Sequence, residues 1–306
     1  MNVKILGTGF YVPSGITTNK DLEKLAPTNA EWVEKNTGIR ERRIADQGET
    51  SSYLGQRAAL NAMLSTNTSP REVDMLIVAT ATPDKLSPST ACIIKDDLGL
   101  ANAVAFDVSA VCSGFLFGMS IAEKYIASGE YKRVLVVGVD VFSTITNWKH
   151  RDCVFFGDGA GAVIMAPTEE RGFLGFSLYS DSYDMTGFYC DHGKNFTMDA
   201  HAVYATAVRV LPIAINGVLK KVGMKIEDVD YLIPHQPSIR ILEDVAGIVG
   251  IPRTKVMTNM QRYGNTVAGT IPILLAETWG KLKKGDIVLF AAIGSGWSYG
   301  AAIYEV

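Results

Sequence analysis

The sequence predicts a layered α/β protein built from two similar halves. Apolar runs typical of strands alternate along its 306 residues with stretches long enough for helices. "SPREVDMLIVAT" resembles "KIEDVDYLIPHQ", so that Asp74 matches Asp230 at an offset of 156 (230 minus 74). "YKRVLVVGV" resembles "KGDIVLFAA", so that Val134 matches Ile287 at an offset of 153 (287 minus 134). Two nearly equal offsets indicate an internal duplication, and chance similarity of apolar strands is the alternative.

Each element is predicted from its local pattern. Short apolar runs between turn-forming residues predict strands, and longer amphipathic or apolar runs predict helices. The predicted strands cover 75–80, 103–108, 133–139, 153–156, 162–166, 231–234 and 287–293. The predicted helices cover 51–65, 89–98, 113–128, 201–222, 237–249 and 267–283.

Composition excludes several classes of protein. The chain is 47% hydrophobic and 20% charged with a net charge of −3, so no basic surplus favours nucleic-acid binding. Four cysteines without C-x-x-C spacing predict neither a disulfide framework nor a metal site. We find no signal peptide and no run of about 18 apolar residues for a membrane span. These observations predict a cytoplasmic protein and make the sequons at Asn67 and Asn195 chance matches.

Cys112 lies between a predicted strand and a predicted apolar helix in "DVSAVCSGF". A buried core residue is the alternative interpretation, because free cysteine is among the most buried residue types. Adding 153 to its number gives Asn265, which also lies between a strand and a helix. In a duplicated fold, two such helix N-termini can point at a common centre. A helix N-terminus lowers a thiol pKa and favours the nucleophilic thiolate, so position favours a catalytic Cys112.

His235 follows the predicted strand 231–234, at a strand end where α/β sites collect. A hydrogen-bonded structural histidine is the alternative. Together Cys112, His235 and Asn265 would suit acyl transfer through a thioester.

Two glycine-rich segments follow or precede strands. "FFGDGAGAVIM" lacks the phosphate-loop spacing and leads into a strand, so we interpret it as a tight turn with close backbone approach. Gly294 and Gly296 flank Ser295 after a strand, where a turn can aim N–H groups at an oxyanion, although an ordinary turn is the alternative. The residues interpreted as ion-pair or capping residues are Asp158, Asp107 and Arg40.

Six motifs in order resemble the β-ketoacyl-[acyl-carrier-protein] synthase III family of thiolase-fold condensing enzymes. They are "ILGTGFYVPSGITTNKDLE", "EWVEKNTGIRERRIA", "FDVSAVCSGF", "FGDGAGA", "PHQPSIRI" and "YGNTVAGTIP". The resemblance covers essentially the whole chain. It implies a thiolase-like, duplicated αβαβα five-layered fold, usually homodimeric. The N-terminal half, 1–166, would carry the nucleophilic cysteine, and the C-terminal half, 167–306, the histidine and asparagine.

The resemblance also implies a reaction. Cys112 would take an acyl group from acyl-CoA, and a decarboxylative condensation with malonyl-acyl-carrier protein would give a β-ketoacyl thioester. His235 and Asn265 would bind the malonyl thioester carbonyl and stabilise the enolate. The N–H groups of Cys112 and Ser295 would form the oxyanion hole. Apart from the CoA thioester substrate, neither a cofactor nor a metal is expected.

Family binding positions carry over unevenly. Trp32 would stack on the CoA adenine, with Arg151 as its candidate partner, although His150 could occupy that place. His201 stands where the family has an asparagine for the pantetheine arm. Ser87 replaces an aromatic that gates the primer pocket from the dimer partner, which would leave room for a longer or different acyl group.

Other departures concern the acyl-carrier protein and the terminal turn. Arg240 is retained, but Ala205, Gly247 and Ile248 replace the family's other docking cations. Their loss should weaken attraction to an acidic carrier. Ser295 replaces a glycine of the family's terminal turn.

Three functions fit these residues. A synthase III enzyme of fatty-acid initiation or of secondary metabolism is the first. A cysteine-dependent acyltransferase that releases no carbon dioxide is the second, and retention of both His235 and Asn265 favours condensation over it. A non-catalytic partner subunit is the third, and an intact Cys112 argues against it.

Overall fold

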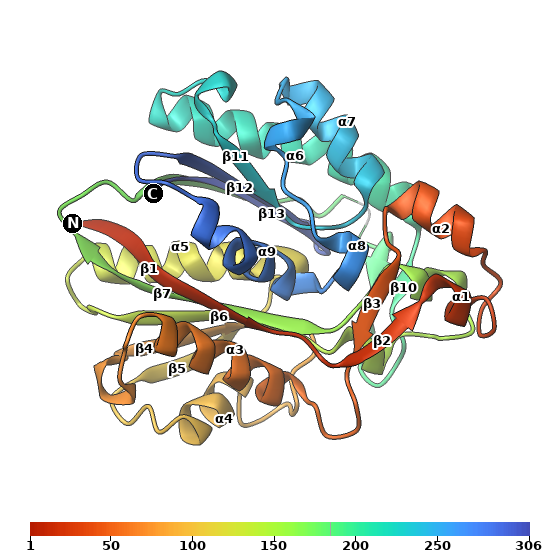
Figure 1. Ribbon diagram of the computed structural model, residues 1–306, viewed down its shortest axis with the longest axis horizontal. Coiled ribbons are helices and arrows are strands. Elements are labelled where there is room, and N and C mark those ends of the chain that lie inside the picture. The colour runs from red at the N-terminus through yellow and green to blue at the C-terminus, as the bar shows by residue number, and fades with distance from the viewer. Residues whose placement is uncertain (184) are drawn as a thin grey trace.

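The protein has five layers in the computed structural model, which describes residues 1–183 and 185–306. Two β-sheets enclose a pair of helices, and each sheet carries further helices on its outer face (Figure 1). The layers run helices, sheet, helices, sheet, helices. This is the predicted duplicated αβαβα arrangement.

The first sheet has five strands in the order β1-β7-β6-β4-β5. Pairing is antiparallel from β1 through β7 to β6 and parallel from β6 through β4 to β5. The strands are β1 (Asn2–Tyr11), β7 (Gly159–Thr168), β6 (Val134–Asp140), β4 (Met75–Ala79) and β5 (Val104–Val108).

The second sheet has four strands in the order β11-β12-β13-β8. Here β11 and β12 are parallel, and β13 is antiparallel to both of its neighbours. The strands are β11 (Tyr231–Pro234), β12 (Ile287–Gly294), β13 (Ser298–Glu305) and β8 (Phe173–Ser180). Two small sheets pair β2 (Gly15–Thr18) with β3 (Glu41–Ile44) and β9 (Phe188–Tyr189) with β10 (Thr197–Met198). The division of the chain at residue 166 stays a prediction.

The helices form the other three layers. Helices α3 (Ser51–Ser65) and α4 (Thr90–Asp97) cover the outer face of the first sheet. Helices α5 (Gly114–Ala127) and α9 (Thr270–Thr278) lie between the sheets, and α6 (Ala200–Val222) and α7 (Ile239–Val249) cover the second. The short helices are α1 (Asn19–Leu22), α2 (Ala30–Thr37), α8 (Met260–Tyr263) and the 3-10 turns η1 (Pro70–Glu72), η2 (Val111–Ser113), η3 (Phe142–Ile145), η4 (Arg151–Val154), η5 (Ile226–Asp228), η6 (Arg253–Lys255), η7 (Val267–Gly269) and η8 (Trp279–Lys281).

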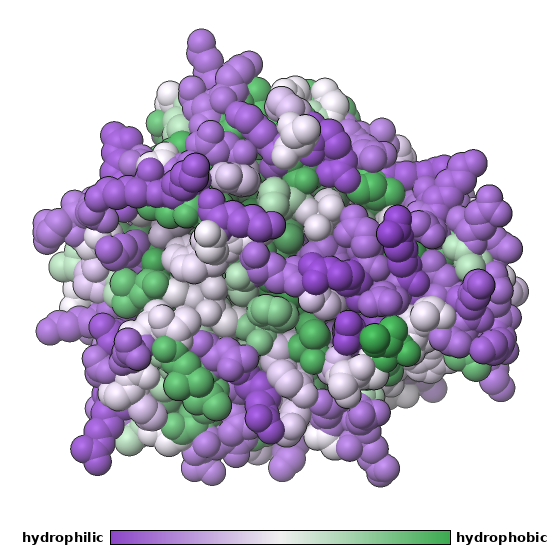
Figure 2. All heavy atoms as spheres, viewed as in Figure 1, coloured by the Kyte–Doolittle hydropathy of each residue, from purple (hydrophilic) through white to green (hydrophobic). Residues whose placement is uncertain are grey.

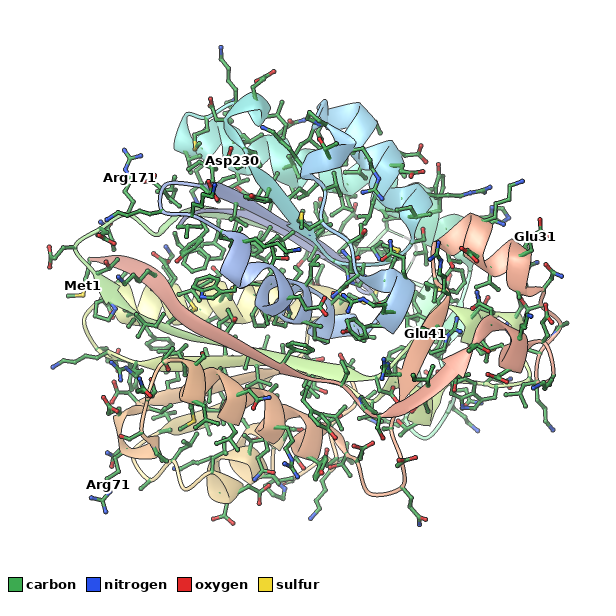
Figure 3. All side chains as sticks on the ribbon, in the orientation of Figure 1. Met1, Glu31, Glu41, Arg71, Arg171 and Asp230 are labelled. Atoms are coloured by element: carbon green, nitrogen blue, oxygen red, sulfur yellow. The ribbon has the colours of Figure 1, made fainter. Side chains whose placement is uncertain are left out.

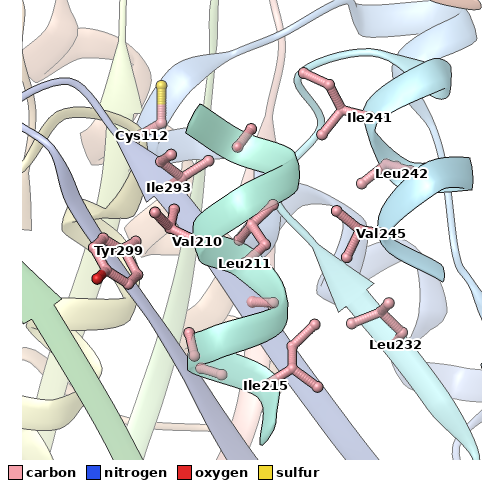
Figure 4. Packing of buried hydrophobic residues seen from close by; sticks show 14 of the residues in the cluster. Cys112, Val210, Leu211, Ile215, Leu232, Ile241, Leu242, Val245, Ile293 and Tyr299 are labelled. Carbon is pink, nitrogen blue, oxygen red and sulfur yellow. The ribbon is translucent and has the colours of Figure 1, made fainter. Parts of the chain in front are cut away.

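Buried apolar clusters fill the spaces between layers. One cluster joins both sheets through α5 and α9, and a second lies between α3 and the first sheet. A third lies beneath α6 and α7, where Cys112 and Ile293 lie side by side at one end of it (Figure 4). The outer surface is mainly hydrophilic, with scattered apolar patches (Figure 2).

Helix α6 is long and apolar enough, by length and composition alone, to cross a membrane. Half of its most apolar window is buried inside the protein, against β8, β13 and α7. Asp199 caps its start by accepting from the N–H groups of His201 and Ala202, and Gly223 ends it at φ 72°. Its apolar character is that of a helix covering a sheet.

The two halves superpose in register as well as in order. Asp74 accepts hydrogen bonds from the N–H groups of Lys132 and Arg133 ahead of β6. Asp230, at the amino end of β11 (Figure 3), accepts one from the N–H of Ile287 at the start of β12. Equivalent acids thus tie equivalent strands together, which agrees with the offset of 156.

Strand pairing corrects the second offset. Met75 pairs with Val134, whereas Tyr231, 156 residues after Met75, pairs with Val288. The equivalent of Val134 is therefore Val288, one residue beyond the predicted Ile287. The mismatch arose because an apolar strand can be shifted by one residue without changing its character.

The turns give a different partner for Cys112. The 3-10 turns η2 and η7 each begin with a valine at positive φ, Val111 at 47° and Val267 at 53°. They are 156 residues apart (267 minus 111), so the equivalent of Cys112 is Ala268 and not Asn265. Asn265 lies three residues earlier, ahead of the turn.

Other differences from the predicted elements are local. The predicted strand 153–156 is mostly the 3-10 turn η4, because a short apolar run does not distinguish a strand from a buried turn. The predicted helix 267–283 is divided into η7, α9 and η8. The predicted strands did not include β1 and β8, which are edge strands of the two sheets, or β13, which lies between β12 and β8.

Candidate functional site

A cavity of about 570 Å³ extends from the surface to the thiol of Cys112. It brings together residues from both halves of the chain, at the carboxyl ends of the central strands. The predicted site residues that line it are Cys112, His235, Asn265, Ser295, Trp32, Arg151, His201 and Arg240. Their roles remain predictions, but they share one space.

Cys112 lies in η2, directly ahead of α5, with 4% of its surface exposed. Burial raises the pKa of its thiol, and the nearby charge of Asp140 raises it further. A hydrogen bond from the Asn265 side chain lowers that pKa but does not offset the rise. The sequence predicted a lowered pKa from the helix N-terminus, and that prediction is wrong, because desolvation by burial is the larger effect and raises the pKa.

Asn265 is held on both sides by backbone hydrogen bonds. Its N–H donates to the carbonyl of Phe155, and its own carbonyl accepts from the N–H of Gly157. Its side-chain oxygen Oδ1 accepts from the N–H of Val267 at 2.8 Å. The amide NH₂ is therefore left as the part of the side chain that can donate into the cavity.

Gly157 explains why "FFGDGAGA" is glycine-rich. A Cβ at Gly157 would stand 2.3 Å from the carbonyl oxygen of Tyr263, which is too close for any side chain. The predicted close backbone approach is confirmed, but the segment forms a bridge from Phe156 to Asn265 and then enters β7 without a tight turn. Glycine here allows the segment that pairs with Asn265 to reach it.

His235 is buried and follows β11, with its backbone N–H bonded to the carbonyl of Ala291. Its Nδ1 lies 2.8 Å from Oγ1 of Thr270. Burial lowers the pKa of His235 from 6.5 to about 3, so the ring is neutral at physiological pH. A neutral ring can hydrogen-bond to a thioester carbonyl without adding a charge to the cavity.

The turn after β12 approaches Cys112 closely. A Cβ at Gly294 would stand 3.0 Å from the backbone nitrogen of Cys112. Ser295 donates from Oγ to the carbonyl of Phe188, which anchors the turn. The absence of a side chain at Gly294 leaves room beside the Cys112 N–H, as an oxyanion site would need.

Aromatic and basic side chains surround the outer part of the cavity. The guanidinium of Arg151 lies 3.6 Å from the ring centroid of Trp32, a cation–π contact. His150 instead pairs with Asp152, its Nδ1 lying 3.1 Å from the carboxyl. His201 opens α6 and Arg240 lies in the first turn of α7, both exposed. Of the two candidates, Arg151 is the one beside Trp32.

Ser87 does not line the cavity of the single chain and is exposed. Four phenylalanines in mutual contact instead form an apolar wall, two of which, Phe156 and Phe188, line the cavity. The centroids of Phe142 and Phe156 are 4.4 Å apart, and those of Phe156 and Phe196 are 4.8 Å apart. The sequence analysis missed this wall, because its members come from four separate segments.

The sequence analysis also passed over Asp140. It follows the buried strand "VLVVGV" directly, and its side chain is fully buried. An acidic residue at the end of so apolar a strand was a signal available in the sequence. Among residues 1–183 and 185–306, no group of three or more histidine, cysteine or acidic side chains could hold a metal ion.

Known proteins resemble this chain over its whole length. Residues 106–182 match the family model described as 3-oxoacyl-[acyl-carrier-protein (ACP)] synthase III, and residues 219–306 match that of its C-terminal part. The β-ketoacyl-[acyl-carrier-protein] synthase III of Oceanobacillus iheyensis is 42% identical over 305 residues, 98% of each chain.

Solved structures agree. The crystal structure of 3-oxoacyl-[acyl-carrier-protein] synthase III from Aquifex aeolicus matches with a TM-score of 0.97 and 41% identity, covering 100% of both chains. The priming β-ketosynthase of the R1128 polyketide pathway matches with a TM-score of 0.95 and 29% identity, covering 99% of this chain and 96% of that one.

Proposed function

Since the chain belongs to the 3-oxoacyl-[acyl-carrier-protein] synthase III family of condensing acyltransferases, we propose that Cys112, His235 and Asn265 carry out its reaction. The observation that carries this assignment is their convergence on one cavity from separate elements of both halves.

Priming would use the N-terminal half. Cys112 attacks the carbonyl carbon of an acyl-CoA thioester, and the CoA thiol leaves with the proton that the cysteine loses. The N–H groups of Cys112 and Ser295 would stabilise the tetrahedral oxyanion. Because burial raises the pKa of Cys112, the resting enzyme holds a thiol, and the thiol must lose its proton as it attacks.

Condensation would use the C-terminal half. His235 Nε2 and the Asn265 amide donate to the malonyl thioester carbonyl as carbon dioxide leaves, and the electrons of the broken C–C bond form an enolate. The enolate carbon attacks the acyl-Cys112 carbonyl and expels the cysteine thiolate. His235 donates from Nε2 only in the tautomer whose Nδ1 accepts the Thr270 hydroxyl proton. The 2.8 Å contact does not by itself select the tautomer, because Oγ1 of Thr270 also lies 2.9 Å from the carbonyl of Val267, to which it can donate its proton.

A short acyl-CoA fits the cavity best as primer. Phe156 and Phe188 line the cavity that holds Cys112, with ring centroids 6.0 Å apart, and their bulk favours a short primer. The longer primer expected from Ser87 depends on a partner subunit, where that position would contribute. An acyl-CoA chain-length profile of Cys112 labelling distinguishes the two, since a short-chain optimum supports the wall and a long-chain optimum supports Ser87.

The remaining assignments concern partners and location. Malonyl-acyl-carrier protein would be the second substrate, with Arg240 as the retained docking cation. A homodimer is supported by β5, which pairs only with β4 within the described chain and leaves Val104 47% exposed. Leu86 lies four residues ahead of α4, the helix that packs on β5, and is 87% exposed. We also propose a cytoplasmic location.

The test follows each half-reaction separately. Intact-mass spectrometry after incubation with acetyl-CoA should show one acetyl group, absent from Cys112→Ala. Release of radiolabelled carbon dioxide from malonyl-acyl-carrier protein should then accompany β-ketoacyl product. An acylated Cys112→Ala protein would overturn the nucleophile. Transfer of the acyl group without carbon dioxide release would favour the alternative acyltransferase.

A further inference from the structure

Asp140 and Gly294 occupy equivalent positions in the two halves. Asp140 ends β6 and Gly294 ends β12, 154 residues later, which is the offset that strand pairing gives for these strands. Each stands beside the turn that precedes a central helix. Gly294 adjoins the backbone nitrogen of Cys112, and Asp140 adjoins that of Ala268.

The N–H groups of Cys112 and Ala268 differ in whether a side chain accepts from them. At Gly294 no side chain covers the N–H of Cys112. At Asp140 the carboxyl oxygen Oδ2 accepts from the N–H of Ala268 at 3.0 Å. The second half therefore keeps the geometry of an oxyanion site but closes it with a built-in acceptor.

The same carboxyl group joins three segments. Its Oδ1 accepts from the N–H of Ala81 at 2.7 Å and from the hydroxyl of Thr82 at 2.9 Å, both just after β4. The hydroxyl of Thr80 lies 3.3 Å away. Asp140 thus fixes η7 of the C-terminal half to the ends of two strands of the N-terminal half, with its side chain fully buried.

Turn η7 in turn holds both groups assigned to condensation. The N–H of Val267 donates to Oδ1 of Asn265 at 2.8 Å. Oγ1 of Thr270 lies 2.9 Å from the carbonyl of Val267 and 2.8 Å from Nδ1 of His235. Hydrogen bonds therefore run from Asp140 through η7 to Asn265 and His235, and none of these bonds involves the N–H of Cys112.

We propose that Asp140 is a positioning residue for the decarboxylation half-reaction, acting from the opposite half of the chain by holding η7 in place. The inference rests on the proposed function, in which Asn265 and His235 bind the malonyl thioester. Asp140 touches neither substrate. It orders the donors that do, and its charge reaches priming only by raising the pKa of the Cys112 thiol.

The test measures the two half-reactions of the full-length enzyme with Asp140→Asn. Asparagine keeps the shape but offers one acceptor oxygen in place of two. We expect acetylation of Cys112 by acetyl-CoA to be no slower than in wild type, because loss of the Asp140 charge lowers the thiol pKa, and carbon dioxide release from malonyl-acyl-carrier protein to fall on the order of 10²-fold. Both rates are divided by the number of sites that can be acetylated, so that a smaller amount of folded protein does not change either value.

Two further variants guard the interpretation. Thr270→Val breaks the same hydrogen-bonded path beyond η7 and should show the same split between half-reactions. Asp74→Asn is the matched control, because Asp74 also accepts two backbone N–H groups but lies at the opposite end of the strands. It should leave both rates unchanged per site.

The outcomes separate this inference from the function itself. Equal losses of both rates in Asp140→Asn, or no loss of either, would overturn the positioning role. Failure of the wild-type enzyme to acetylate Cys112 or to release carbon dioxide would instead overturn the proposed function.

Discussion

The turns η2 and η7 begin alike and end in different chemistry. Both open with a left-handed valine and lead into a helix that lies between the sheets. Where η2 places the thiol of Cys112, η7 places the methyl of Ala268. Where the N–H of Cys112 is left uncovered beside Gly294, that of Ala268 is covered by Asp140. One backbone design thus serves as a reactive centre in one half and as a rigid support in the other.

The largest expected effect comes from removing the amide donor of Asn265, whose side chain η7 holds in place. Asn265→Ala should leave Cys112 acylation intact and lower condensation on the order of 10²-fold, the usual loss for one donor to a developing oxyanion. The measurement is product formation from acetylated enzyme and malonyl-acyl-carrier protein.

A serine at position 265 distinguishes two roles of Asn265: donation to the substrate and the hydrogen bond that holds η7. Asn265→Ser can still accept from the N–H of Val267 but lacks the amide donor. If it condenses at the wild-type rate, Asn265 acts only by holding η7, and its assignment as a substrate donor is wrong.

An intermediate effect is expected from making the two halves more alike. In Gly294→Ala the added Cβ would stand 3.0 Å from the Cys112 nitrogen and 2.6 Å from the carbonyl oxygen of Ala110. The turn must shift, so we expect priming to fall by about 10- to 10²-fold while decarboxylation changes less. Stopped-flow release of CoA measures priming.

Gly247→Ala is the matched control for that variant. Gly247 lies on the exposed side of α7, and a Cβ there meets nothing within 4 Å. Alanine should raise the free energy of unfolding by up to about 1 kcal/mol and leave both half-reactions unchanged. Faster or unchanged priming in Gly294→Ala would show that crowding at Gly294 does not matter.

The smallest effects concern the pH dependence of stability, where the halves should act in opposite directions. Burial lowers the pKa of His235 to about 3, so between pH 3 and 6.5 the unfolded chain binds a proton that the folded chain does not. His235 therefore makes the protein more stable as pH rises. Burial raises the pKa of Asp140 to about 7, so between pH 4 and 7 the folded chain holds the extra proton, and stability falls as pH rises.

Single variants should expose each contribution. Relative to wild type, His235→Gln should make the slope of unfolding free energy with pH more negative by about 1.4 kcal/mol per unit, and Asp140→Asn more positive by about as much. Denaturant unfolding between pH 4.5 and 6.5 measures both slopes. Slopes that shift in the same direction would contradict the assigned pKa directions.

Much of the fold was predictable because most strands and helices have a clear apolar pattern in the local sequence. The motif around Cys112 and the strand end before His235 pointed to the right segments for the same reason. What the sequence could not show is the register between the repeats, because two apolar strands can be aligned one residue apart with equal agreement, and because the offset is 154 for β6 and β12 but 156 for the turns η2 and η7. Asn265 was therefore matched to Cys112 in place of Ala268. The roles of Phe156 and Asp140 depend on contacts between distant segments, which no local pattern encodes.

The two left-handed valines limit how far this protein can be made more stable without loss of activity. Val111 and Val267 hold a backbone conformation that disfavours branched side chains, at a cost of about 1–3 kcal/mol each. Net domain stability is only about 5–15 kcal/mol. Glycine at either position would relieve that strain, yet it would also let the turn move that aligns a reactive group. Glycine at position 111 or 267 should therefore raise thermal stability and lower catalytic activity together.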